Sequence, residues 1–539
     1  MKKILAAFVL AAALMSCVNI NQGVGGDFIP TNMKYDFHSA EFDLGEIWMK
    51  SADSLSGYSS RRINFGAIRD ETYGLFKRGC ALTLVPVMDS VYFGENPIFR
   101  RFKFQAVFDT VSVSYPSQQN ILQNVNVYEL TESLEKSKYY SRTEVKHGTR
   151  RVTKGVPVVN GSDSLTFDFS ADFGRKYLGI SQSDMEDFDR YQDKFPGIFI
   201  TTDDPVGEGG RFNMFHMNIL ESGSSYVYRS DNYAVLYYSG VYNGERRDSS
   251  LMFYFSPLKF QDLDSLVNAN AMPDQYVFNV DYHESDHMAG VAGDKVYIEG
   301  GSGLKPVIPA SEIHRLVTTE IARKGGDPST ALISKATIEL PFDFPDDYRD
   351  MYLFPDVLSP TIKISSDSTV AFAGLTDASV STENQGTVNR SLCVYAPDIT
   401  HHVQQIIRKE DTSELTPYDI WLLIMHNETT TTTNAEASEM AQYYQQLAYY
   451  SYYNQLYGGG YGGYGSYYGS YGGYGGYGGY GYSNYYNYMM MAQYASESAA
   501  TTSTSAELDL DRFYKCWLRG PESDGKKPKL KITYALPKE

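Results

Sequence analysis

The sequence predicts a mainly β protein made of two β-sandwich or jelly-roll-like modules, and three observations support this prediction. Short runs of alternating apolar and polar residues, rich in β-branched and aromatic side chains, recur between Asn, Asp, Gly, Ser and Pro. Of the 539 residues, 42% are apolar and 21% charged, so the chain can bury a sizeable core. Few segments have a helical period. This pattern is typical of antiparallel sheets that bury one face.

The strand-like runs are distributed along most of the chain. We place the boundary between the two modules near residue 245, so the N-terminal domain spans 28–245 and the C-terminal domain spans 246–428 and 505–539. A length of 539 residues is compatible with about two to four domains. The clearest runs are 106–114 (AVFDTVSVS), 125–130 (VNVYEL), 165–169 (LTFDF), 233–238 (YAVLYY) and 335–340 (KATIEL).

Two short helices are expected in the C-terminal module. Ser311 is predicted to cap the first and Thr400 the second, because a side-chain oxygen before an apolar-periodic run satisfies free backbone N–H groups. Their apolar faces are expected to pack on the core. These faces contain Ile313, Leu316, Val317 and Ile321 in the first helix and Val403, Ile406 and Ile407 in the second.

The first residues predict a lipoprotein signal peptide at 1–16. Lys2 and Lys3 precede an apolar run that is shorter than the roughly 20 residues a membrane-spanning helix needs. The run ends in Leu-Met-Ser-Cys at 14–17, which resembles a bacterial lipobox. Cys17 is therefore expected to carry a covalent diacylglycerol and an acyl chain, with 17–27 as a tether and no other cofactor. An ordinary secretory signal with a chance cysteine is the alternative.

Location and charge restrict the expected partners. Val18 follows the cysteine, in place of the Asp of an inner-membrane retention signal, so we expect an outer-membrane protein in either leaflet. The formal net charge of −18 gives no basic excess to displace phosphate counterions, which argues against nucleic acid. Only Cys80, Cys393 and Cys516 remain besides Cys17, without CxxC spacing. At most one disulfide can form among them, and a zinc ribbon is excluded.

Several segments together resemble a known family. In chain order they are GDFIP at 26–30, NFG at 64–66, VNVYELTESLEKSKYYS from 125, VYIEGGSGLKPVI from 296 and KLKITY from 529. Their order is similar to the Bacteroidota outer-membrane lipoproteins catalogued as domain of unknown function 4270, over nearly the whole mature chain. The resemblance implies β-sandwich modules and no catalytic residues to transfer. It also implies an accessory subunit beside outer-membrane barrels, including their assembly machinery.

One motif raises the alternative of a zinc metallopeptidase. His283, Glu284 and His287 match HExxH, in which two histidines one helical turn apart bind zinc and the glutamate acts as general base. That chemistry needs a helix, yet 276–282 (YVFNVDY) alternates as a strand, and the third-ligand position of the longer form is Gly293. We therefore predict a strand end and a polar turn here, and no metal site.

A Thr-rich and then Tyr/Gly-rich insert is expected at 429–504, as one long loop in the C-terminal module. Of the 46 tyrosines, 20 lie between 443 and 494, and a glycine-rich tract cannot bury enough surface to fold alone. The insert is a spacer, a sticky surface for a protein or membrane interface, or a set of rings that stack on sugars. The candidate contact residues are Tyr471, Tyr474, Tyr477 and Tyr480.

Together these features predict a lipid-anchored outer-membrane protein with a non-enzymatic binding or scaffolding role next to another outer-membrane protein. A surface lipoprotein that binds glycans or host molecules is the alternative within the binding class. The zinc metallopeptidase is the enzymatic alternative.

Overall fold

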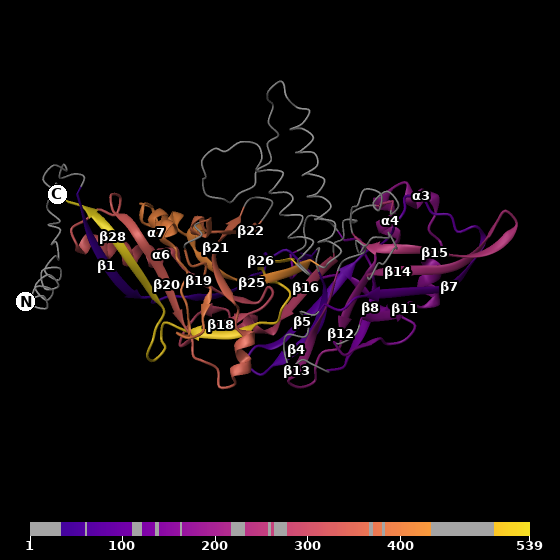
Figure 1. Ribbon diagram of the computed structural model, residues 1–539, viewed down its shortest axis with the longest axis horizontal. Helices are drawn as coiled ribbons and strands as arrows, with labels where there is room; N and C mark the ends of the chain where they lie inside the picture. The colour runs from indigo at the N-terminus through magenta and orange to yellow at the C-terminus, as the bar shows by residue number, and fades with distance from the viewer. Residues whose placement is uncertain are drawn as a thin grey trace, which may run out of the picture.

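The computed structural model shows an elongated molecule of two lobes built from antiparallel sheets (Figure 1). It describes residues 34–59, 62–109, 121–134, 140–161, 164–216, 232–256, 260–262, 277–365, 370–379, 383–432 and 501–538. Strands dominate these residues and helices are few, so the mainly β prediction is confirmed. No helix in the described ranges has the length and apolar character needed to cross a membrane.

The N lobe is a sandwich of two sheets. Its core lies between them and is rich in aromatic side chains such as Phe102, Phe104 and Phe253. The nine-stranded sheet contains β3 (Tyr58–Ser59), β4 (Arg62–Asp70), β5 (Gly74–Leu82), β8 (Gln123–Leu130), β9 (His147–Arg151), β10 (Val158–Val159), β12 (Ile198–Thr202), β13 (Gly209–His216) and β16 (Val277–His283). The five-stranded sheet contains β6 (Leu84–Pro86), β7 (Glu95–Ala106), β11 (Leu165–Asp168), β14 (Tyr233–Tyr242) and β15 (Glu245–Phe255). Helices α2 (Ala171–Tyr177), α3 (Gln182–Met185) and α4 (Phe188–Lys194) adjoin them.

The C lobe packs two larger sheets and two helices, α6 (Ala310–Arg323) and α7 (Thr400–Ile407), around one core. The first sheet runs β1 (Tyr35–Asp43), β28 (Lys529–Pro537), β20 (Leu332–Pro341), β24 (Val394–Tyr395) and β23 (Val388–Asn389). The second runs β17 (Gly290–Val291), β2 (Trp48–Ser51), β19 (Leu304–Ile308), β25 (Ile420–Thr432), β21 (Val357–Ser365) and β22 (Val370–Gly374), with β26 (Thr501–Leu508) beside β25. A ribbon of β18 (Lys295–Glu299) and β27 (Lys515–Arg519) completes it. Short 3₁₀ helices are η5 (Glu284–Met288), η6 (Tyr348–Leu353), η7 (Thr376–Ser379), η8 (Thr412–Glu414) and η9 (Thr416–Tyr418).

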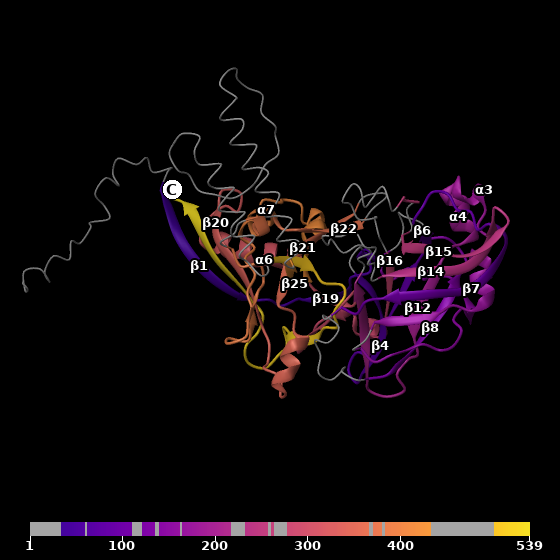
Figure 2. The same cartoon turned by 45° about the vertical axis from the view of Figure 1, so that its right-hand side comes forward.

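The predicted module boundary near residue 245 is wrong. It falls inside the β14–β15 hairpin, where Tyr242 pairs with Glu245. The chain begins in the C lobe, because β1 pairs with β28 and β2 pairs with β19; it then forms the N lobe from β3 to β16 and returns. Figures 1 and 2 both show β1 beside β28 at the end of the molecule that holds the C-terminus. Alternation along a strand indicates that it pairs, but not with which distant strand.

The predicted ends of the Tyr/Gly-rich insert are also wrong. Residues 429–432 and 501–504 belong to β25 and β26, which pair in one continuous register from Met425 opposite Leu508 to Thr432 opposite Thr501. Threonine is β-branched and favours extended backbone, so its run continues the hairpin. Tyr471, Tyr474, Tyr477 and Tyr480 lie outside the described residues, as does Cys17.

Most predicted strands coincide with observed ones, and one does not. The runs at 125–130, 165–169, 233–238 and 335–340 match β8, β11, β14 and β20. The run at 106–114 meets the twelve-residue β7 only at Ala106, Phe108 forms an isolated bridge with Phe215, and 110–114 lie outside the described residues. The pattern did not reveal the rest of β7. The first seven residues of β7 are mostly exposed and mix acidic, polar, apolar and basic side chains, so they lack a clear apolar alternation.

Both predicted helices form, but neither predicted cap does. α6 starts after Pro309, and the carboxylate of Asp419 accepts a hydrogen bond from Ala310 N at 3.0 Å. At the start of α7, Asp377 accepts from His401 N and His402 N at 2.7 and 3.1 Å. Both helices are therefore capped by carboxylates from distant segments, which a local sequence pattern cannot reveal.

Candidate functional site: a buried polar cluster between the lobes

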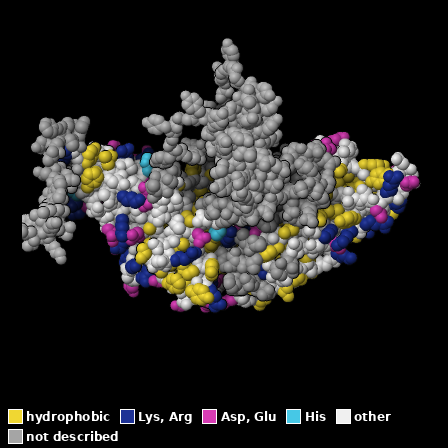
Figure 3. All heavy atoms as spheres, viewed as in Figure 1, with side chains coloured by type: hydrophobic (Ala, Val, Ile, Leu, Met, Phe, Trp, Pro, Cys, Tyr) yellow, Lys and Arg dark blue, Asp and Glu magenta, His cyan; other side chains and the backbone are white. Residues whose placement is uncertain are grey.

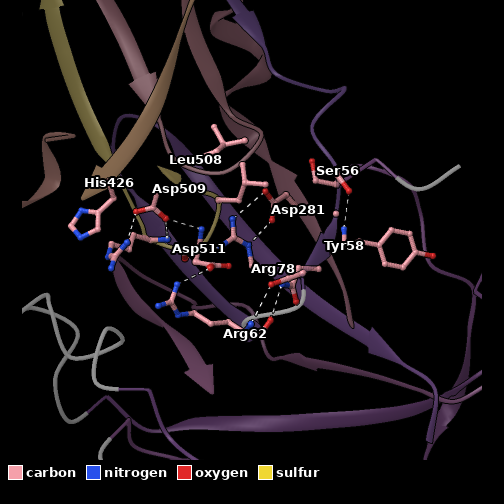
Figure 4. A pocket seen from close by; sticks show the side chains of 15 residues that line it. Ser56, Tyr58, Arg62, Arg78, Asp281, His426, Leu508, Asp509 and Asp511 are labelled. Carbon is pink, nitrogen blue, oxygen red and sulfur yellow. Dashed lines mark hydrogen bonds and ion pairs between the residues drawn. The ribbon is translucent and has the colours of Figure 1, made fainter. Parts of the chain in front are cut away.

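A cluster of buried charged side chains lies where the two lobes meet. In the N lobe its residues lie on β4, β5 and β16. In the C lobe they lie in the turn between β18 and β19 and in residues 509–512, which follow β26. Figure 4 shows Arg62, Arg78, Asp281, Asp509 and Asp511 directed toward one another. Buried charges are costly unless each is paired, so the partners of each group define what the cluster does.

Arg78 is the centre of the cluster. Its side chain is 1% exposed, and its guanidinium donates to both carboxylate oxygens of Asp281 at 2.6 and 3.1 Å. The remaining terminal nitrogen donates to the backbone oxygen of Asp511 at 2.8 Å, across the lobe boundary. A two-pronged pair of this kind is among the stronger polar contacts in proteins. Arg78 thus ties two strands of the N lobe to a loop of the C lobe.

A second arginine repeats this bridging. Arg62 donates to Asp109 at 2.6 Å within the N lobe and to Asp511 at 3.2 Å in the C lobe. The neighbouring amide of Asn64 donates to the backbone oxygen of Asp511 at 2.8 Å. Asp511 therefore receives contacts from both arginines and from Asn64. On the C-lobe side, Arg512 pairs with Asp509 at 2.7 Å and holds the loop in shape.

His283 and Lys305 extend the cluster into the C lobe. His283 Nδ1 lies 2.8 Å from a carboxylate oxygen of Glu299, and the hydroxyl of Ser285 donates to that same oxygen. The ammonium of Lys305 donates to the backbone oxygens of Glu299, Gly301 and Gly303 at 2.5, 3.0 and 3.1 Å. All four side chains are buried. The turn after β18 is thus wrapped around the amino group of Lys305, whose pKa burial lowers to about 7, and its Gly301 adopts a φ of 54° that favours glycine.

The pKa values follow these partners. Burial alone would raise the pKa of Asp281, but the charge of Arg78 and the bonds to His283 hold that pKa well below its usual value. Burial alone would lower the pKa of His283, but the charges of Glu299 and Asp281 raise it. For Asp511, burial and the charge of Asp509 raise the pKa although both arginines oppose them. Opposite charges therefore favour the ionised forms of Asp281 and His283 despite their burial, whereas the pKa of Asp511 moves toward the neutral form.

A cavity of about 210 Å³ opens beside the cluster. Its walls come from both lobes and include Arg62, Arg78 and Asp511. His426 and Leu508, at the base of the β25–β26 hairpin, line the opposite side (Figure 4). Most of the charged groups on its walls already bind each other, so the cavity offers few free charges to a ligand.

The structure separates the residues of the HExxH motif. β16 ends at His283 and a 3₁₀ turn follows, so the predicted strand end and polar turn are confirmed. His283 points into the buried cluster, whereas His287 is exposed with its Nδ1 2.6 Å from Glu284 O. The carboxylate of Glu284 accepts from Leu75 N at 2.8 Å and pairs with Arg69. In the described part of the chain, no group of three or more His, Cys, Asp or Glu side chains is arranged to hold a metal ion.

Sequence analysis missed every charged member of the cluster except His283. A signal was present in the sequence. Arg78 alternates in step with Phe76 and Cys80, whose side chains are buried, so strand alternation would have placed the Arg78 side chain on the same, buried face. The partner carboxylates were not recognisable, because Asp281 and Asp511 lie 203 and 433 residues away from Arg78. Cys80, Cys393 and Cys516 are free thiols, so no disulfide links these three.

The raised pKa of His283 predicts a pH-dependent contribution to stability. A histidine whose folded pKa lies above its ordinary 6.5 stabilises the fold fully below that pH and loses this contribution as the pH rises through the folded pKa. Replacing His283 with Gln should therefore lower the melting temperature most at about pH 5.5, and the gap to wild type should narrow by about pH 9. Thermal unfolding followed by circular dichroism measures this. The exposed His287→Gln variant is the control, and an equal gap at both pH values for His283→Gln would contradict the prediction.

The geometry is that of a set of internal ion pairs and hydrogen bonds that join the two lobes. On the face visible in Figure 3, acidic and basic side chains are interspersed over both lobes. Comparison with protein-family models, curated proteins and solved structures found no match to this chain.

Proposed function

We propose that this protein is a lipid-anchored, non-enzymatic scaffolding protein of the outer membrane, an accessory subunit next to outer-membrane barrels or their assembly machinery. The observation that carries the proposal is the buried cluster, in which Arg62 and Arg78 of one lobe both bind Asp511 of the other. A binding protein that holds a partner at a fixed distance from a membrane needs such a fixed joint. Removing flexibility between lobes reduces the entropy lost on binding.

The position of the first described residues supports an anchor at the C-lobe end of the molecule. The described chain begins at Lys34, beside Lys538 at the end of the first C-lobe sheet, where the two backbones are hydrogen bonded. Cys17 lies 17 residues before Lys34, so a lipid on it would hold the outer end of the C lobe near the membrane. The N lobe lies at the opposite end of the long axis (Figure 1) and would extend away from the anchor.

Lipid attachment is tested by replacing Cys17 with Ala. In cells given radioactive palmitate, the wild-type protein should be labelled and recovered with the outer membrane, and the variant should lose both properties. The physical reason is that several acyl chains make membrane binding effectively permanent, whereas none remain in the variant. Replacing the buried Cys80 with Ala is the control that should keep the label. Persistent labelling of the Cys17 variant would refute the anchor.

The partner is identified by chemical crosslinking in intact cells followed by mass spectrometry. Outer-membrane barrel proteins as the main crosslinked species would support the accessory role, and their absence would refute it. Deleting residues 457–482 then separates the two interpretations of the insert: lost crosslinks indicate a contact surface, unchanged crosslinks a spacer. Stoichiometric zinc, with casein hydrolysis that is lost in Glu284→Ala, would instead establish the peptidase.

A further inference from the structure

A groove of about 720 Å³ lies on the outer face of the nine-stranded sheet, and Asp281 is the one residue that lines both this groove and the cavity beside the buried cluster. Its floor comes from the neighbouring strands β8, β12, β5 and β16, and one wall comes from the segment that includes Arg142 and His147. Side chains alternate between the two faces of a strand. Cys80, Ile198 and Ile200 face the core, so their neighbours Gly79 and Phe199 face this groove. Its volume is within the roughly 300–1,000 Å³ typical of small-molecule sites.

The floor is flat because one position carries no side chain. Gly79 lies opposite Val280, and a Cβ on Gly79 would come within 2.3 Å of the Phe199 ring. The absence of that atom lets the ring lie across the strand. On the neighbouring strands Asn126 pairs directly with Thr201, and both side chains are buried beneath the polar side of the floor, where Asn126 supports the exposed Asp203. The result is a surface that is apolar at its centre and polar along one side.

Two aromatic rings flank this floor. His147 is exposed, and its ring stacks on both Tyr128 and Phe199, with ring centroids 4.9 and 4.8 Å apart. On the β16 side, Tyr282 is 56% exposed and lies opposite Lys77 on β5. A flat ring that is supported from below and open above presents an apolar face to a ligand at little entropic cost.

The polar groups at the end of the groove are held in place. Asn124 and Asn126 both donate to the carboxylate of Asp203, at 2.8 and 2.7 Å, and these bonds hold the pKa of Asp203 below its usual value. Lys77 donates to Asp204 at 2.6 Å. Fixed carboxylate and amide groups suit ligand hydroxyls, which both donate and accept hydrogen bonds.

The charges of the groove disfavour an anionic ligand. Its two cations already bind carboxylates, Lys77 to Asp204 and Arg142 to Asp286 at 2.5 Å. No cation in the described lining is left to pair with a phosphate, sulfate or uronate group. A ligand that stacks on flat rings and offers many hydroxyls without a charge has the chemistry of a neutral sugar chain.

We propose that this groove binds a neutral oligosaccharide, whose sugar rings stack on His147 and Tyr282 and whose hydroxyls bond to the exposed carboxylates of Asp203 and Asp204. This site is independent of the proposed anchor and scaffold role. It places sugar recognition on the strands of the N lobe, and the Tyr/Gly-rich insert is not needed for it.

The test is calorimetric titration of the full mature chain with four neutral probes: maltohexaose, cellohexaose, xylohexaose and chitohexaose. We expect at least one to bind, and Tyr282→Ala and His147→Ala each to weaken that binding about three- to tenfold. Tyr282→Phe retains the ring and should stay within about twofold of wild type. The matched control is Tyr237→Ala, which removes an exposed tyrosine of the other N-lobe sheet and should change nothing.

Three results would overturn the proposal. The first is no binding of any neutral probe. The second is equal affinity of wild type and both ring variants. The third is preferential binding of a different ligand. Binding of polygalacturonate that is tighter than binding of every neutral probe would indicate an anionic ligand. Binding of a synthetic peptide of residues 457–482 that is lost in Tyr282→Ala would indicate that the groove holds the chain's own insert. Because both rings are exposed, unchanged melting temperatures of the variants show that lost binding is not lost folding.

Discussion

Replacing Arg78 with Met should lower the free energy of unfolding by about 3–5 kcal/mol, because it leaves Asp281 charged, buried and without its partner. The change also removes the bond from Arg78 to the backbone oxygen of Asp511. We therefore expect the joint between the lobes to weaken together with the N lobe itself. Urea unfolding of the full chain measures the loss.

The positions of the tryptophans make this experiment more informative. Trp48, Trp421 and Trp517 are the three tryptophans of the chain, and all lie on strands of the C lobe. Tryptophan fluorescence therefore reports on the C lobe, while circular dichroism reports on both lobes. In the wild type the two signals should change together, and in Arg78→Met the dichroism should change first. Coincident transitions test for a single cooperative unit.

Arg349 offers the matched control for this variant. It makes an equally close pair with Asp347, at 2.6 Å, but both side chains are well exposed. Exposed pairs contribute little, so Arg349→Met should change the free energy of unfolding by less than about 1 kcal/mol. A loss from Arg78→Met no larger than the loss from this control would contradict the role of the buried cluster.

Replacing Lys305 with Met should have an effect of similar size, about 3–5 kcal/mol. The methionine has nearly the same length but cannot donate, so the backbone oxygens of Glu299, Gly301 and Gly303 lose their common donor. Each buried acceptor without a partner costs about 1–3 kcal/mol, and the three costs are not fully additive. Urea unfolding followed by tryptophan fluorescence measures the loss in the lobe that contains Lys305.

Lys295 is the control on the neighbouring β18 strand. Its ammonium lies 4.9 Å from the centre of the Trp517 ring, a contact worth about 0.5–1 kcal/mol at exposed sites. Lys295→Met should therefore be nearly neutral. Equal losses of unfolding free energy from the two lysine variants would show that the turn after β18 does not depend on the Lys305 amino group.

The secondary structure was largely predictable from the sequence, because strand and helix patterns are local. The alternation of 125–130 and 335–340 is visible within a few residues, and so is the helical period of 313–321. The sandwich of the N lobe follows from the same alternation, which gives each sheet one apolar face. Errors arose where local pattern and tertiary pairing disagree, as with the exposed start of β7.

Features that depend on distant pairing were not predictable. The caps of α6 and α7 come from Asp419 and Asp377, which are 109 and 24 residues from the backbone groups they bind. The buried cluster and the groove face are likewise assembled from strands far apart in the chain. Arg78 is a buried charge and Tyr282 an exposed ring, and only the structure shows the neighbours of each.

The pairing of the first strand with the last one has a consequence for how the protein is made. β1 and β28 form nine successive residue pairs from Tyr35 opposite Pro537 to Asp43 opposite Lys529. A ribosome finishes β1 early and β28 at the very end, so β1 has no partner during nearly all of synthesis. Contacts this distant close slowly, because the chain entropy of the loop is lost before the contacts form. The C lobe therefore completes its first sheet only once β28 has been synthesised, so this lobe cannot finish folding before the N lobe's strands have all been made.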